Sequence, residues 1–316
     1  MRIFRAVGEV PADFGPSALT IGNFDGVHAG HRQIMRRVAA LARERELTPA
    51  VLTFDPHPAR VLAPDRAPRL LMTIDQRLRG MEKEGIDSVL LIPFSFEFAK
   101  LTPAEFVEQV LVDRLKARVL LVGEDFRFGY KQGGNIETLR DMGARFGFEL
   151  EPVAGIFRRG ERISSTRIRS LVITGAVSRA CRLLGAPFAL EGPVVKGQGI
   201  GSKQTVPTLN LQPLNETLPK TGVYVTRTRD PGSGREWNSI TNVGFRPTFG
   251  GDALTVETFL LGPMGEAHPE RIEVEFLLFV REERKFASPE ELKAQILRDV
   301  AVANRLHRRL LTYRVG

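Results

Sequence analysis

Cysteine and tryptophan are nearly absent from this chain of 316 residues, which contains one of each. A single cysteine excludes an intramolecular disulfide and fits a reducing compartment. This residue, Cys181, precedes Leu183 and Leu184 in a helical pattern, where we expect it to pack. No apolar run is long enough to span a bilayer, and residues 1–7 lack the sustained apolar stretch of a signal peptide. We therefore expect a cytoplasmic protein that has no membrane partner.

Signatures of nucleic-acid-binding modules are also missing, although the formal net charge is +8. Such a charge invites a nucleic-acid hypothesis. The basic residues, however, are scattered in short groups such as Arg36-Arg37, Arg158-Arg159 and Arg308-Arg309, with little aromatic interleaving. A basic surface that binds small anionic substrates explains the charge equally well, so we expect no nucleic-acid partner. The sequence leaves the oligomeric state open.

Strand and helix signals alternate through the first half of the chain. This β-α repetition predicts an α/β domain with a parallel, doubly wound sheet. Ligands of such sheets bind beyond the carboxyl ends of the strands, where the loops 22–31, 54–58 and 123–129 lie. Strands are expected at Ser17–Ile21, Pro49–Phe54, Ser88–Pro93, Arg118–Val122 and Glu149–Val153, and helices at 30–46, 75–84, from Thr102 onward and at 135–146.

After Pro187 the pattern changes to short β-rich runs separated by turn clusters. This pattern is typical of an antiparallel barrel or sandwich. A closing helix is expected after Ser288, which is a suitable N-cap followed by a proline. We therefore predict two domains, 1–185 and 186–316. The expected strands are Ala189–Val195, Gly222–Thr228, Trp237–Val243, Thr255–Leu261 and Arg271–Val280.

The segment Gly22-Asn23-Phe24-Asp25-Gly26-Val27-His28-Ala29-Gly30-His31 directly follows the first expected strand and precedes a helix. Glycine lets the backbone approach a ligand closely, and a helix N-terminus presents N–H groups and a positive dipole end to a phosphate. His28 and His31 add side-chain donors. We interpret the segment as a nucleotide-phosphate site. The alternative is an ordinary glycine-rich turn with structural histidines. The expected binding residues are Gly22, Asn23, Phe24, Asp25 and Gly26.

A second segment, Ile163-Ser164-Ser165-Thr166-Arg167-Ile168-Arg169, supplies hydroxyl and guanidinium groups just before an expected helix. Alone it is compatible with a simple N-cap. Together with the histidine segment, it predicts two walls that flank a triphosphate from opposite sides. Ser164, Ser165 and Thr166 are then binding residues, and Arg169 is able to fork onto two phosphate oxygens.

Further motifs extend this pattern along the chain. They are Phe54–Pro58, Gly123–Gly129, Pro207-Thr208-Leu209-Asn210, Asn242–Thr248 and Arg271–Phe279 with Lys285-Phe286. With the two segments above, they make the sequence similar to the bacterial bifunctional riboflavin kinase/FAD synthetase family over nearly its whole length. The resemblance implies a Rossmann-like nucleotidyltransferase domain followed by an antiparallel riboflavin kinase barrel with a C-terminal helix. It also implies riboflavin, FMN and ATP as substrates.

For the first domain the resemblance implies adenylyl transfer, in which FMN and ATP give FAD and pyrophosphate. The attacking phosphate oxygen of FMN is already anionic, so the enzyme needs donors that align it and stabilise charge rather than a general base. We expect His28, His31 and Arg169 to supply these donors, with the histidines acting neither as metal ligands nor as bases. Asp125 matches the adenine/ribose loop of the family. Asp55 and His57 are expected on the flavin-phosphate side, with a rigid loop as the alternative.

For the second domain the resemblance implies riboflavin kinase, which phosphorylates the terminal ribityl hydroxyl. This nucleophile is a neutral alcohol, so a base is useful, and Glu257 matches the base of the family. The alternative is a strand-surface glutamate opposite Lys or Arg. Thr208 and Asn210 match the pair near Mg²⁺ and the nucleotide phosphates. The loop Lys196–Gly201 is suited to covering phosphates. The remaining expected binding residues are Lys196, Gly199, Gly201, Lys203, Asn242 and Arg246.

The second domain departs from the family pattern in two places. Ser202, Thr205 and Leu209 replace an Arg, a Gly and an Ala, and the segment 261–267 replaces an acidic stretch. Because Thr208, Asn210 and Glu257 persist, we predict an active but differently tuned kinase. The departures motivate an alternative, an FMN adenylyltransferase whose barrel only binds flavin. A third hypothesis is an RNA-binding or tRNA-synthetase relative of the same superfamily fold, against which residues 164–169 and the lack of an anticodon-type appendage argue.

Overall fold

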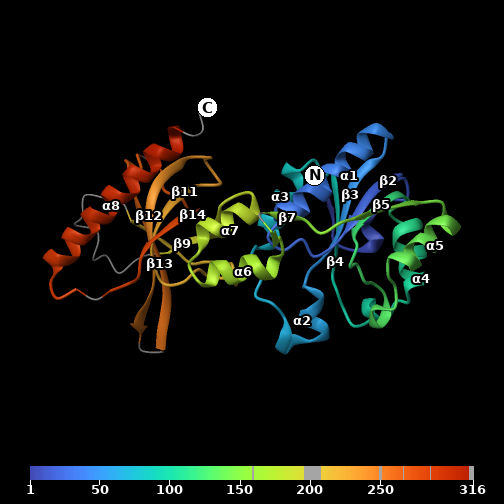
Figure 1. The fold of residues 1–316 in the computed structure, drawn as a ribbon, viewed down its shortest axis with the longest axis horizontal. Coiled ribbons are helices and arrows are strands. Elements are labelled where there is room, and N and C mark those ends of the chain that lie inside the picture. The colour runs from blue at the N-terminus through green and yellow to red at the C-terminus, as the bar shows by residue number, and fades with distance from the viewer. Residues whose placement is uncertain (159, 196–207, 249–250, 266, 285, 313–316) are drawn as a thin grey trace. The chain divides into compact units, whose positions relative to one another are not determined.

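The computed structural model divides the chain into two compact units (Figure 1). It describes residues 1–316 except 159, 196–207, 249–250, 266, 285 and 313–316. Unit 1 comprises Met1–Arg69 and Thr73–Ser164, and unit 2 comprises Leu70–Met72 and Ser165–Gly316. The residues from Ser165 to Pro187 therefore pack with the second unit. The domain boundary expected at 185/186 stays a prediction.

Unit 1 is built on a six-stranded sheet in the order β1-β4-β3-β2-β5-β6, and every neighbouring pair is parallel. The predicted doubly wound sheet is confirmed. Strands β2 and β4 are buried at every position, as expected of parallel strands covered on both faces. The strands are β1 (Arg2–Phe4), β2 (Ser17–Ile21), β3 (Thr48–Phe54), β4 (Ser88–Ile92), β5 (Ala117–Gly123) and β6 (Glu149–Val153).

The strand order fixes where a ligand of unit 1 has its crevice. From β2 the chain continues to β3 and β4 on one side, whereas β5 and β6 lie on the other side of β2. The order therefore reverses between β2 and β5, and ligands of such sheets bind outside the carboxyl ends at this point. The loop after β2 and the loop after β5 meet there, because Thr20 of β2 pairs with Leu121 of β5.

Local capping determines where several helices of unit 1 begin. Capping boxes, in which the N-cap and the third helical residue exchange hydrogen bonds, start α3 at Thr73, α4 at Thr102 and α5 at Asn135. The helices are α1 (Ala29–Glu44), α2 (Pro58–Leu62), α3 (Ile74–Lys83), α4 (Pro103–Glu105), the π-helical η4 (Phe106–Val112) and α5 (Ile136–Phe146).

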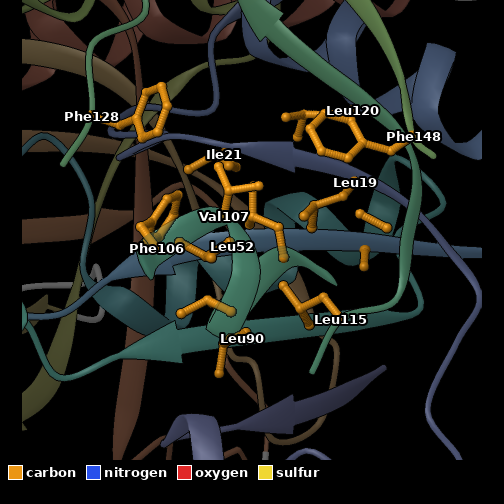
Figure 2. Close-up of a cluster of buried hydrophobic side chains, with 14 of the residues drawn as sticks. Leu19, Ile21, Leu52, Leu90, Phe106, Val107, Leu115, Leu120, Phe128 and Phe148 are labelled. Atoms are coloured by element: carbon orange, nitrogen blue, oxygen red, sulfur yellow. The ribbon is translucent and has the colours of Figure 1, made fainter. Parts of the chain in front are cut away.

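One hydrophobic cluster ties the sheet of unit 1 to η4 (Figure 2). Leu19, Leu52 and Leu90 come from three adjacent strands, and Phe106 and Val107 of η4 pack against them. All five side chains are at most 4% exposed. Burial of each large apolar side chain contributes roughly 1.5–3 kcal/mol, so this cluster anchors the strand ends that carry the site.

Unit 2 is a closed antiparallel barrel in the order β10-β13-β12-β11-β14-β9, in which β9 pairs again with β10. The predicted barrel is confirmed and the sandwich alternative is wrong. The sequence reading missed β10, which is only four residues long. The elements are α6 (Ser165–Ile173), α7 (Val177–Leu184), β9 (Phe188–Val195), β10 (Thr208–Leu211), β11 (Gly222–Arg229), β12 (Glu236–Thr248), β13 (Gly251–Leu260), β14 (Arg271–Arg281) and α8 (Pro289–Thr312).

The wall of the barrel has an apolar outer face and a partly polar inner one. Helix α8 packs on the outside, where Ala303 joins Val223, Val225 and Ile240 (Figure 1). The opposite face of β11, β12 and β13 carries fully buried hydroxyl groups. Thr226 shares hydrogen bonds with Ser239 at 2.8 Å and with Thr241 at 2.7 Å, and Thr241 shares one with Thr258 at 2.9 Å. These bonds satisfy hydroxyls that burial would otherwise penalise.

A short segment from the first half of the chain, Leu70–Met72, belongs to unit 2. Thr217 donates its N–H to the Leu70 carbonyl at 3.0 Å, and the Leu70 N–H donates to Glu216 Oε2 at 2.8 Å. Asn215, which is 6% exposed, donates from Nδ2 to the Leu71 carbonyl at 3.1 Å. Its Oδ1 accepts the N–H of Glu191 in β9 at 2.9 Å. Asn215 is thus a polar centre that joins this segment to the barrel.

Candidate functional site

The loop after β2 has an unusual backbone conformation. Phe24, Gly26 and Val27 have φ angles of 51°, 85° and 36°. A β-branched residue such as Val27 rarely adopts a left-handed conformation, and strain of this kind costs about 1–3 kcal/mol unless the surroundings hold it. The Val27 side chain is fully buried and packs against Gly80 of α3. The surroundings therefore determine the shape of this loop.

His28 is the N-cap of α1, and its hydrogen bond fixes the position of its proton. Nδ1 accepts the N–H of His31 at 3.2 Å. In a neutral imidazole one nitrogen accepts and the other carries the hydrogen, so Nε2 is the donor. Burial lowers the pKa of His28 from 6.5 to about 4. At neutral pH this side chain therefore offers an uncharged N–H at the N-terminus of the helix.

The ring of His31 lies directly on that of His28. Their centroids are 3.5 Å apart with an interplanar angle of 18°, and the edge of Phe24 approaches His31 at 5.1 Å. Burial, with a contribution from His28, lowers the pKa of His31 well below its usual value. Nδ1 of His31 is buried and has no hydrogen-bond partner among the described residues. The predicted histidine segment is thus a stacked, neutral pair that presents donors.

Other predicted residues of unit 1 lie at neighbouring strand ends. His57 is the N-cap of α2, where its Nδ1 accepts the N–H of Ala59 at 3.1 Å. Asp55 directly follows β3 and is exposed. Asp125, two residues beyond β5, accepts a hydrogen bond from Arg162 Nη2 at 2.7 Å, and both side chains are largely exposed. A surface ion pair of this kind contributes little to stability, so Asp125 remains available for a ligand.

An aromatic chain along the same edge of the sheet was missed by the sequence reading. Six phenylalanine rings follow one another with centroid separations of 5.5–6.2 Å and mostly edge-on or tilted geometry. They come from the end of β3, from the segment after β4, from η4 and from the loop after β5. Four of the six are only partly buried. We call them the phenylalanine ladder: Phe54, Phe94, Phe98, Phe106, Phe126 and Phe128.

The second predicted wall needs a correction. We expected residues 163–169 just before a helix, but α6 begins at Ser165. Ser165 and Thr166 therefore form its first turn, and Arg169 lies one turn later on the face of Ser165. Ser164 belongs to unit 1 and Arg169 to unit 2. The clamp of a triphosphate between the two segments stays a prediction.

In the barrel, cross-strand register brings the predicted kinase residues onto one face. Glu257 of β13 pairs with Asn210 of β10 on one side and with Asn242 of β12 on the other. Directly opposite residues of antiparallel strands share a face, so the three form a row. The alternative of a glutamate opposite Lys or Arg is wrong for these two register positions. Thr208, two residues before Asn210, shares that face, and its Oγ1 is buried without a hydrogen-bond partner in the described part of the chain.

Several predictions for the barrel lie outside the described residues: Lys196, Gly199, Gly201, Ser202, Lys203 and Thr205, together with the side chain of Arg246. Leu209 is described, and it is 7% exposed. Because strand side chains alternate, it lies on the opposite face from Thr208 and Asn210. This departure from the family pattern therefore affects packing rather than the row itself. Within the departing segment, the Pro263 carbonyl accepts a hydrogen bond from Trp237 Nε1 at 3.2 Å.

A parallel sheet with a donor-lined loop at its switch point defines a nucleotide-binding α/β unit, joined in one chain to a six-stranded barrel that carries a Glu-Asn-Asn row. Comparison with known proteins is consistent with this class. A family model described as FAD synthetase matches residues 10–167, and one described as riboflavin kinase matches residues 184–307.

Full-length relatives make the assignment more specific. The bifunctional riboflavin kinase/FMN adenylyltransferase of Escherichia coli K12 is 37% identical to this chain, over 90% of this chain and 91% of the relative. The protein of the same description from Pseudomonas fluorescens is 36% identical, over 97% of this chain and 98% of the relative. The chain belongs to the bifunctional riboflavin kinase/FMN adenylyltransferase family. A solved structure described as a macrolide-efflux protein from Streptococcus pneumoniae has the same fold, with a TM-score of 0.84 and 28% identity over 96% of this chain and 98% of that one. In the described ranges, no helix is long and apolar enough to cross a membrane.

Proposed function

We propose that this chain converts riboflavin to FMN in unit 2 and FMN to FAD in unit 1, with ATP as the second substrate of both reactions. Membership of the family supports the pair of activities, and the residue assignments below are inferred from the geometry. The observation that carries them is the neutral His28 at the N-terminus of α1, with its hydrogen on Nε2. The single cysteine supports a cytoplasmic location.

In unit 1, a phosphate oxygen of FMN attacks the α-phosphorus of ATP, and the bond to pyrophosphate breaks. No proton has to be removed, because the nucleophile is already anionic. What the reaction needs is charge stabilisation by fixed donors. His28 Nε2–H, the ring of His31 and the N–H groups at the start of α1 supply them. Uncharged donors in a buried position act without the counter-charge that a buried imidazolium would require.

The phenylalanine ladder suits the ring system of FMN. Aromatic rings pair in edge-to-face or offset geometry with centroids 4.5–7 Å apart, and the ladder already has this spacing. Its partly exposed members at the ends of β3 and β4 leave aromatic surface for a flavin. Asp55 and His57, one and three residues after Phe54, would then lie toward the flavin phosphate.

In unit 2, the terminal ribityl hydroxyl attacks the γ-phosphorus of ATP, its proton passes to Glu257, and ADP leaves. Asn210 and Asn242 flank Glu257 in the row and orient the carboxylate or its substrate. Thr208 Oγ1, a buried oxygen without a partner among the described residues, fits an Mg²⁺ ligand, and Asn210 on the same face would supply a second oxygen. When bound, Mg²⁺ neutralises charge on the transferred phosphate.

Product analysis with two variants tests the division of labour. The protein is incubated with Mg²⁺ and ATP plus either riboflavin or FMN, and the flavins are separated by chromatography. Glu257→Gln should abolish FMN formation and leave FAD formation from FMN intact, whereas His28→Ala should do the reverse. Glu270→Gln, at an exposed position before β14, is the matched control. Loss of both activities in each variant would refute one site per unit, and FAD formation only from supplied FMN in the unaltered protein would favour the alternative of a flavin-binding barrel without kinase activity.

A further inference from the structure

Arg77 of α3 is the largest fully buried side chain among the described residues, with 1% of it exposed. An arginine is always charged, and transfer of an ion into the interior costs several kcal/mol unless hydrogen bonds offset the lost hydration. The hydrogen bonds of this guanidinium therefore show which groups offset the cost of burying its charge. No motif in the sequence singles it out, and the proposed reaction does not use it directly.

The guanidinium bonds to the carbonyl groups that begin two loops of the candidate site. Nη1 donates to the Asn23 carbonyl at 2.9 Å, and Nη1 and Nη2 donate to the Phe54 carbonyl at 3.4 Å. Asn23 is the second residue after β2, and Phe54 is the last residue of β3. One side chain thus ties together the carboxyl ends of two adjacent parallel strands, where the phosphate segment and the Asp55–His57 segment start.

Helix α3 contacts the phosphate loop at a second point on the same face. Gly80 lies three residues after Arg77, and a Cβ at this glycine would be 3.0 Å from Cγ2 of the buried Val27. The capping box of Thr73 and Gln76 fixes the start of this helix. The left-handed residues Phe24 and Gly26 lie between the two contacts, and Val27, the third left-handed residue, makes the second contact itself. The two contacts thus flank a backbone conformation that the isolated loop would avoid.

We propose that Arg77 is a positioning residue for adenylyl transfer, which holds the phosphate loop so that the imidazole of His28 faces the reacting phosphates. This inference rests on the proposed function of unit 1. Arg77 acts through the Asn23 and Phe54 carbonyls and not by contact with substrate. Lysine would keep the charge but not the planar fork that reaches both carbonyls.

The test is steady-state kinetics of Arg77→Lys in the full-length protein. A misplacement of about 1 Å at a reacting group costs about 10²-fold in rate, so kcat for FAD formation should fall by about this factor, while KM for FMN and for ATP changes by less than about threefold. Riboflavin phosphorylation by the same preparation reports on unit 2 and should be unchanged. Arg79→Lys, on the exposed face of the same helix, is the matched control and should behave like the parent.

A second readout follows the imidazole itself. In the parent, NMR titration of His28 should give a pKa near 4, because the ring is buried. In Arg77→Lys, the opened loop should hydrate the ring and raise this pKa toward 6.5, a change that a uniform loss of stability would not produce. Gly80→Ala perturbs the second contact point, because the new Cβ would press on the buried Val27. Its unfolding free energy is measured together with kcat, since overpacking costs about 1–3 kcal/mol. A lower kcat in a variant that is still fully folded under the assay conditions supports the positioning of the loop.

The outcomes separate this proposal from the function on which it rests. An Arg77→Lys protein whose kcat stays within twofold of the parent, or whose His28 titrates unchanged, would overturn the positioning role even if His28→Ala is inactive. Loss of both activities would overturn it too, because the effect would then be global. Failure of the unaltered protein to make FAD would refute the proposed function instead.

Discussion

The imidazole of His28 has two roles that substitution can separate, because they use different nitrogens. Nδ1 accepts the His31 N–H and caps α1, whereas Nε2 carries the hydrogen that we assign to a phosphate. The side chain of asparagine places an oxygen near the position of Nδ1 and reaches no further. His28→Asn therefore keeps the cap and removes the distal donor, and His28→Ala removes both.

The expected magnitudes differ for the two roles. Asparagine is among the best N-cap residues, and its replacement by alanine costs about 1 kcal/mol. Both variants lose the stack on His31, so the difference between their unfolding free energies should isolate the cap, at about 1 kcal/mol in favour of asparagine. A donor aimed at charge that develops in the transition state contributes about 10²–10³-fold to kcat. Both variants should therefore lose this factor in FAD formation from FMN.

The assay has to report on unit 1. The only tryptophan, Trp237, lies in the barrel, so its fluorescence follows unit 2, and the unfolding of unit 1 is better measured by amide exchange in α1. Riboflavin phosphorylation serves as the activity control. An asparagine variant that retains more than about a tenth of the FAD-forming rate would refute the assignment of Nε2 as a donor of this strength. Equal stability of the asparagine and alanine variants would refute the cap.

Two buried groups, His28 and Asn215, also give predictions about stability. The pKa of His28 is about 4 in the folded protein against 6.5 unfolded, so the unfolded chain binds the proton first as pH falls. Stability is unaffected above pH 6.5 and declines between pH 6.5 and 4, by about 2 kcal/mol at pH 5. Between pH 7.5 and 5 the parent should lose about 2 kcal/mol more than His28→Asn in urea titrations, because His31, whose pKa is also lowered by burial, contributes to the loss in both proteins. Equal losses would contradict the contribution of His28. Asn215→Ala should destabilise unit 2 by about 3 kcal/mol, because it leaves several buried backbone groups unpaired. Trp237 fluorescence in urea measures this loss, for which the exposed Asn238→Ala is the control, and matching midpoints for the two variants would count against the role of Asn215.

Sequence signals close to one another in the chain were enough to predict most of the phosphate segment and the elements beside it. The apolar run of β2, the glycines after it and the helical periodicity from residue 29 all act within about ten residues of one another, and each matches the element that forms. The start of α6 was less certain for a local reason. Ser164, Ser165 and Thr166 are all competent N-cap residues, and only tertiary packing decides between them.

Long-range features escaped the sequence reading because their contact partners lie far apart in the chain. Arg77 and Arg79 are near neighbours on one helix, yet one is 1% exposed and the other lies in solvent. The phenylalanine ladder gathers rings from residues 54 to 128, and only the assembled sheet edge brings them together. The Glu257 row likewise depends on register, since Asn210 lies on the four-residue strand β10, which is too short to predict.

The placement of Leu70–Met72 in unit 2 has a consequence for the order in which the protein is made. Leu71 precedes Asn215 by 144 positions, so during synthesis the segment leaves the ribosome long before its partner exists. Domains generally fold as units from the N-terminus. Unit 1 therefore has to fold while Leu70–Met72, which interrupts its sequence, still lacks its hydrogen-bond partners in the barrel. A gene split at residue 164 or at residue 185 would leave this segment on the first polypeptide, so the barrel encoded by the second would have to recover it from a separate chain.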